Sequence, residues 1–139
     1  MGISRSEVLD QLAYLADELE AQQSVLGVIP KVLWDARPPT DPRSLRDMYS
    51  AMLARECGEY RVAMGLETVP TPDAGDPGTL LSALAERRRA TVAALRGRHL
   101  SEDVLKAGYG ITQQDADSLR EVGLRLHETS MGSPKVRQL

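Results

Sequence analysis

Four features of this sequence could take part in chemistry: a histidine beside a glutamate, one cysteine, a run of arginines and one tryptophan. His127 is followed directly by Glu128. An imidazole can ligate a metal ion or transfer a proton near neutral pH. A divalent first-row metal would need further ligands, which could come from Asp47, Glu56 and Cys57 on a distant predicted helix. The structural alternative, which we favour, is a histidine that is hydrogen-bonded or partly exposed and has no chemical role.

Cys57 is the only cysteine, which excludes an intrachain disulfide and favours a reducing compartment. A reactive thiolate needs cationic neighbours or a helix N-terminus to lower its pKa. Cys57 instead falls near the predicted end of a helix and close to Glu56 and Glu59, whose carboxylates would raise the pKa of the thiol. We therefore expect Cys57 to be a small structural hydrophobe.

The run Arg87-Arg88-Arg89 could bind a phosphate or an acidic partner through its guanidinium groups. Arg88 is the candidate binding residue of the run. Three consecutive helical residues spread over most of the helix circumference, so they cannot all face the core. Glu86 precedes the run, and we favour a solvated, ion-paired surface as the structural alternative. No aromatic residues alternate with these arginines to stack on single-stranded nucleic acid.

Trp34 is the only tryptophan, and the chain has no phenylalanine. Tryptophan is enriched where proteins bind partners, so Trp34 is a further candidate binding residue. The structural alternative is that Trp34 seals one end of the core. Leu, Val, Ala and Met must fill the rest, and such a composition suits helices better than sheets.

The length of 139 residues predicts one domain over residues 1–139. A hydrophobic content of 42% and a charged content of 27% are ordinary for a soluble globular protein. The net charge of −3 disfavours nucleic acid as a partner. The N-terminal residues lack the apolar core of a signal peptide, and no apolar run is long enough to span a bilayer. We therefore expect a cytoplasmic protein with no membrane partner.

Helical spacing of the apolar residues, together with start and stop signals, predicts four helices. Capping pairs, Ser4 with Glu7 and Ser44 with Asp47, mark the first two starts. The predicted helices lie near residues 5–28, 44–60, 79–97 and 112–130, and residues 131–139 are expected to form a flexible tail. The predicted core consists of Leu12, Leu15, Leu19, Leu45, Met52, Leu84, Val92, Leu119, Val122 and Leu126.

Two stretches argue against regular structure. The segment from Val62 to Gly78 is rich in proline and glycine, which predicts a long linker. It is long enough to cross one end of a bundle, so helices two and three need not be antiparallel neighbours. The second stretch, Gly108-Tyr109-Gly110, predicts another break. The fourth helix is then expected to start at Thr112, with Asp115 in the capping position.

The chain resembles the DinB/YfiT superfamily, which is named for damage-inducible bacterial proteins. The residues that carry this resemblance are a proline-containing crossover before Ser44-Leu45-Arg46-Asp47, the segment 81–91, and Ile111-Thr112 followed by Leu126-His127-Glu128. Their order covers most of the chain. The resemblance implies an all-α four-helix bundle with up-down-down-up connectivity, a long crossover between helices two and three, and often a homodimer. Many members bind a divalent metal through three histidines, and some are thiol-dependent transferases or isomerases.

The sequence departs from the family pattern at the positions of those histidines. The family position on helix two falls near Ala51, and the second position on helix four falls on Met131. Only His127 matches a family histidine. Because the chain has two histidines in total, one subunit cannot supply a three-histidine site.

This ligand count favours a metal-free binding or stress-associated protein over an enzyme. We expect no cofactor, and a homodimer whose further partner is a small molecule or a protein. The candidate binding residues are Trp34, Arg88 and His127. The alternative is a metal-dependent enzyme of the thiol-transferase or isomerase type, in which His127 with Glu56 or Glu128 holds zinc or nickel. A third hypothesis is a helical regulator that binds nucleic acid. The negative net charge and the lack of a clear helix-turn-helix motif disfavour it.

Overall fold

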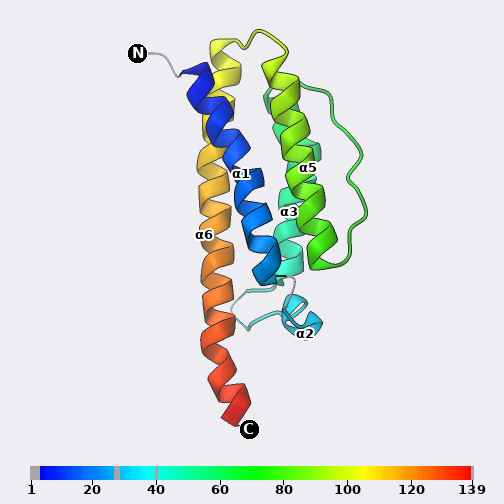
Figure 1. Cartoon of the computed structure of the whole chain (residues 1–139), viewed down its shortest axis with the longest axis vertical. Coiled ribbons are helices and arrows are strands. Elements are labelled where there is room, and N and C mark those ends of the chain that lie inside the picture. Colours follow the sequence, from blue (N-terminus) through cyan, green and yellow to red (C-terminus); the bar gives the residue numbers. More distant parts are fainter. Residues whose placement is uncertain (1–3, 27–28, 40, 139) are drawn as a thin grey trace.

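The computed structural model describes residues 4–26, 29–39 and 41–138, with the backbone alone for residues 25, 31 and 128–138. The described chain is all-α and contains no strand, as the composition predicts. Four longer helices pack against one another (Figure 1). The helices are α1 (Arg5–Leu26), α2 (Lys31–Trp34), α3 (Leu45–Cys57), α4 (Glu59–Ala63), α5 (Pro77–Arg96) and α6 (Glu102–Gln138).

Contacts at the helix ends fix the directions of the longer helices. The Arg5 guanidinium, at the start of α1, donates to the carbonyl of Arg96 at the end of α5, at 2.8 Å. Gln23, near the end of α1, donates to Gly78 at the start of α5. α1 and α5 are therefore antiparallel. α6 runs in the direction of α1, whereas α3 and α5 run in the opposite direction (Figure 1).

The linker between α4 and α5 covers residues 64–76 and is free of helix and strand, as the sequence predicts. It runs along the outside of the bundle back to the start of α5, which lets α3 and α5 point the same way (Figure 1). The Val69 N–H donates to the Cys57 carbonyl at 2.9 Å, and the Arg61 side chain donates to the Glu67 carbonyl at 2.5 Å. These two bonds attach the linker to the helices beside it.

The predicted start of the second long helix is confirmed. The Asp47 N–H donates to Ser44 Oγ at 3.1 Å, and the Ser44 N–H donates to the Asp47 carboxylate at 3.0 Å. The helix predicted over 44–60 is interrupted at Gly58, which separates α3 from α4. Glycine loses the most backbone freedom in a helix, so it is the position where this helix is weakest.

The predicted start at Thr79 is two residues late. Asp76 caps α5 by accepting from the Thr79 N–H at 3.0 Å, and Pro77 occupies the first turn. Proline suits that position because its missing N–H would have no helical partner there and its fixed φ matches the helix.

The prediction of a break at Gly108-Tyr109-Gly110 is wrong, and so are the predicted bounds 112–130 of the last helix. α6 is continuous for 37 residues, and Ser101 caps it by accepting from the Val104 N–H at 3.2 Å. Gly108 is needed for packing: a Cβ there would lie 2.8 Å from Val8 Cγ1 of α1. The predicted stop near 130 also fails because glycine and proline lower helix propensity without forbidding a helix.

The core prediction is largely confirmed. Eight of the ten predicted core residues are buried, in two hydrophobic clusters, and Leu119 and Leu126 are partly buried against the larger of the two. In the described part of the chain, no helix is both long and apolar enough to cross a membrane.

Candidate functional site

A buried ion cluster lies inside the bundle where α1, α3, α5 and α6 meet. Arg88 of α5 and Glu56 of α3 are fully buried, and Asp115 of α6 is 7% exposed. Arg88 Nε donates to Glu56 Oε1 at 2.8 Å, and its two terminal nitrogens donate to the two oxygens of Asp115 at 2.7 and 3.1 Å. Arg88 Nη1 also donates to the Leu12 carbonyl of α1 at 3.0 Å. One side chain therefore joins four helices.

All three nitrogens of the Arg88 guanidinium group have oxygen partners. Arg88 Nη2 also lies 2.7 Å from Glu56 Oε1, so each of the three nitrogens has at least one oxygen partner. Glu56 Oε2 differs: it is buried, and the described residues give it no hydrogen-bond partner. Removing a buried charge from water is costly unless an opposite charge and hydrogen bonds offset the loss. The cluster supplies both for Arg88, but two carboxylates share one cation.

The pKa values in the cluster reflect this imbalance. Burial raises the pKa of Asp115, and this effect outweighs the opposing hydrogen bonds and charge of Arg88. Burial by itself would lower the pKa of Arg88, but hydrogen bonds to Asp115 and the charge of Glu56 raise it above its usual value. Arg88 therefore stays charged at all ordinary pH values.

A second arginine lies beside the cluster. Arg55 Nε donates to the Tyr60 hydroxyl at 3.2 Å, and Arg55 Nη2 donates to Ser118 Oγ at 3.3 Å. Tyr60 is buried, and burial raises the pKa of its hydroxyl. Arg55 is bonded to these two hydroxyl groups, so its charge acts on Asp115 only across space.

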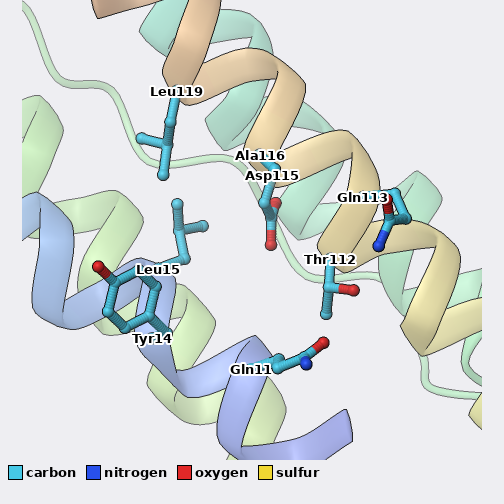
Figure 2. A pocket seen from close by; sticks show the side chains of 8 residues that line it. All are labelled: Gln11, Tyr14, Leu15, Thr112, Gln113, Asp115, Ala116 and Leu119. Carbon is cyan, nitrogen blue, oxygen red and sulfur yellow. The ribbon is translucent and has the colours of Figure 1, made fainter.

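Next to the cluster, a pocket of about 280 Å³ opens between α1 and α6. Figure 2 shows the side chains that line it, with the Asp115 carboxylate pointing from α6 toward α1. Leu15, Ala116 and Leu119 supply apolar surface, and Gln11, Thr112 and Gln113 supply polar groups. Tyr14 lies at the edge of the pocket, where its hydroxyl donates to Glu18 at 2.5 Å. Asp115 is thus both a pocket wall and a partner of Arg88.

This arrangement suits binding. Ligand sites are mostly apolar concavities with a few well-placed polar groups. Among the described residues that line the pocket there is no cysteine, histidine, lysine or serine to act as a nucleophile, and the one carboxylate is already bonded to Arg88. The strongest chemical feature of the site is a charged hydrogen-bond acceptor at the wall of an apolar pocket.

The structure does not bring the predicted metal-site residues together. His127 is exposed on α6, while Glu56 is fully buried against Arg88. Asp115 and Glu56 share Arg88, and His127 lies twelve residues further along α6 than Asp115, which is about 18 Å at 1.5 Å per residue. The side chains of Glu128 and Met131 lie outside the described residues. Among described side chains, no three His, Cys, Asp or Glu residues are grouped as metal ligands.

The other two candidate features have structural positions. Trp34 is fully buried and stacks on Tyr49, with ring centroids 5.7 Å apart. It therefore seals one end of the core, as the structural alternative holds. Cys57 is buried, and burial raises the pKa of its thiol, with the charge of Glu56 acting in the same direction. Both features contribute to packing.

The expectation of a solvated face for the arginine run is wrong for Arg88 and right for Arg89. Arg89 is exposed and pairs with Glu20 and Asp17 of α1. Arg88 follows Leu81, Leu84 and Ala85 on the buried face of α5, at helical spacing. This spacing is the signal from which the sequence alone could have identified Arg88 as a core residue. Asp115 was missed because it was assigned to a helix cap.

The comparisons with known proteins found no match among family models, curated proteins or solved structures.

Proposed function

We propose that this chain is a non-enzymatic, metal-free binding protein that holds a small molecule in the pocket between α1 and α6. The observation that carries the proposal is the pocket of about 280 Å³ whose mainly apolar wall contains the buried carboxylate of Asp115. This volume is just below the usual range for ligand sites, about 300–1,000 Å³. The ligand is therefore compact.

We further propose that the chain is a divergent DinB/YfiT-like protein with up-down-down-up connectivity, and that it has a stress-associated role. Two features support the fold assignment. α1 and α6 run one way, and α3 and α5 run the other (Figure 1). The linker over 64–76 serves as the long crossover that this order requires. Ala51 in place of a family histidine supports the loss of metal chemistry.

Ligand binding is tested by NMR with a library of small fragments. The amide signals of Thr112 and Ala116 should shift with compounds that occupy the pocket. Ala116→Trp places a large side chain on the pocket wall and should abolish these shifts. The matched control is Ala93→Trp at an exposed position of α5, which should leave them unchanged. Fragment binding that survives Ala116→Trp would contradict the assignment of this pocket.

Metal analysis separates this proposal from the enzymatic alternative. We expect protein purified without a histidine tag to carry less than one equivalent of transition metal. A catalytic zinc site usually has three protein ligands and one open position, and His127 alone would hold a divalent ion weakly. If one equivalent of zinc or nickel is found and His127→Ala removes it, the metal-dependent enzyme becomes the preferred function.

A further inference from the structure

We propose that the ligand of the α1–α6 pocket is a primary amine, bound as its ammonium ion, on a compact hydrocarbon body. This inference rests on the proposed function and names its ligand class. Three features of the pocket carry it: the carboxylate that is its one charged lining group among the described residues, the free acceptor capacity of its polar wall, and the separation of its polar and apolar surfaces.

The charge of the site favours a cation. Asp115 is the one charged group among the described residues that line the pocket, and it is a carboxylate. Glu56, Arg88 and Arg55 act on Asp115 from nearby, but none of the three is among the described residues that line the pocket. No lysine, arginine or histidine is among the described residues that line the pocket. On α1, Tyr14 at the pocket edge bonds to another carboxylate, that of Glu18.

The polar wall has acceptor capacity to spare. Each oxygen of Asp115 accepts one bond from Arg88, and a carboxylate oxygen can accept a second. Thr112 lies three residues earlier on α6, and its hydroxyl donates to the Tyr109 carbonyl at 2.6 Å. This bond uses the hydroxyl proton and leaves the Thr112 oxygen free to accept. An ammonium group has three N–H donors and no acceptor, so it matches a wall that offers acceptors.

The apolar part of the pocket lies to one side of that wall. Figure 2 shows Leu15 and Leu119 together on one side of Asp115, with Thr112 and Gln11 on the other. An ammonium between Asp115 and Thr112 would leave its hydrocarbon body against the two leucines. The small pocket volume suits a body of one saturated ring or a short branched chain.

The test compares three molecules of one shape on the wild-type protein: cyclohexylmethylamine, cyclohexylmethanol and cyclohexanecarboxylate. Affinities come from the NMR shifts of Thr112 and Ala116, at low salt. The amine should bind at least about 10-fold more tightly than the alcohol, because a hydrogen bond to a charged group is stronger than a neutral one. The carboxylate should bind most weakly.

The variant Asp115→Asn keeps the shape of the wall and removes its charge, so it should reduce the amine-to-alcohol affinity ratio to about one. Asp117→Asn is the matched control: Asp117 is an exposed residue of the same helix that pairs with Arg120, and its loss should leave the ratio unchanged. Because the wild-type series gives the ratio by itself, it decides the inference even if Asp115→Asn fails to fold.

The outcomes separate the two proposals. If the alcohol binds as tightly as the amine, the pocket is a binding site and the amine inference is overturned. If none of the three molecules shifts Thr112 or Ala116 but other fragments do, the amine inference is overturned and the proposed function stands; if no fragment shifts these signals either, both proposals fail. If these signals instead shift with protein concentration and ignore all three ligands, a second copy of the chain occupies the groove, and both proposals fail again.

Discussion

Arg88 is a charged residue at the centre of the contacts inside this protein. It is fully buried and bonds to groups of α1, α3 and α6 from its place on α5. A hydrophobic side chain could fill the same space, and buried ion pairs often add little net stability relative to such a replacement. Once Glu56 and Asp115 are buried, however, Arg88 is required to offset their charge.

We therefore expect Arg88→Met to lower the free energy of unfolding by about 3–5 kcal/mol, because two buried carboxylates lose their partner. Urea unfolding followed by circular dichroism measures this loss. The matched control is Arg89→Met, one residue away, which removes an exposed pair with Glu20 and Asp17 and should leave the free energy of unfolding nearly unchanged. Equal losses in the two variants would contradict the central role of Arg88.

Asp41 is a second residue whose charge matters, since it joins the segment before α3 to α6. Its carboxylate accepts from Arg125 at 2.6 Å and from Arg43 at 3.1 Å. Hydrogen bonds from the Arg43 side chain and backbone, together with the charge of Arg125, lower the pKa of Asp41 from 3.8 to about 2. A carboxylate with a lowered folded-state pKa stabilises the protein above its unfolded-state pKa and loses this effect in acid.

Asp41→Asn should therefore lower the thermal midpoint at pH 6, and the difference from wild type should shrink as the pH falls from about 4 to about 2. Thermal unfolding at several pH values checks this. Asp73→Asn, on the exposed linker, serves as a control for a change of net charge by one unit. A difference that grows toward pH 2 would show that the sign of this interaction has been assigned wrongly.

At the scale of the element, α6 shows that a glycine within a helix can either weaken the helix or allow a neighbouring helix to pack closely. Gly108 and Gly110 look alike in the sequence and together predict a chain break. In the structure they lie on one continuous helix, and only Gly108 faces a neighbour. Gly108 permits the close approach of α1 and α6, which also positions the two walls of the pocket.

The two glycines should respond oppositely to alanine. Gly110→Ala should stabilise the protein by up to about 1 kcal/mol, because alanine has the higher helix propensity and its Cβ would meet no atom within 4 Å. Gly108→Ala should destabilise it, because the new Cβ would lie 2.8 Å from Val8 Cγ1 and the χ1 angle of valine is restricted.

Urea unfolding of both glycine variants provides the measurement. Adding Val8→Ala to Gly108→Ala should recover part of the loss, which identifies the overlap as its cause. Stabilisation by Gly108→Ala in the wild-type background would mean that α1 and α6 are further apart than described.

At the scale of the whole molecule, several large apolar side chains are left on the surface. Val32, Val62 and Leu124 are 75%, 62% and 57% exposed, and they belong to α2, α4 and α6. We propose that the chain forms a homodimer in which the outer side of α6 takes part. A specific interface should bury more than roughly 1,000 Å² in total.

Leu124→Arg should then shift the mass measured by light scattering from dimer to monomer, because an unpaired charge would be buried in the contact. Val62→Arg on α4 is the control and should leave the mass unchanged. A wild-type monomer at high protein concentration would contradict the proposed dimer.

The sequence by itself determined the helical class, most of the core and the long linker. Regular spacing marks Leu12, Leu84 and Val122 as buried, and a local capping pair marks the start of α3 at Ser44. These features depend on neighbours in the chain or on a periodic pattern, so they can be read without knowing the fold.

Only the tertiary structure decided the candidate site. Arg88 lies 32 residues from Glu56 and 27 from Asp115 in the chain, and no local pattern links them. Asp115 fits a capping position as well as it fits a buried ion cluster, and Gly108 fits a break as well as a close contact with Val8. In each case the free energy of folding depends on which side chain of another helix packs against the residue. That choice is made when the helices pack, and it is why the pocket beside Asp115 appears only in the folded chain.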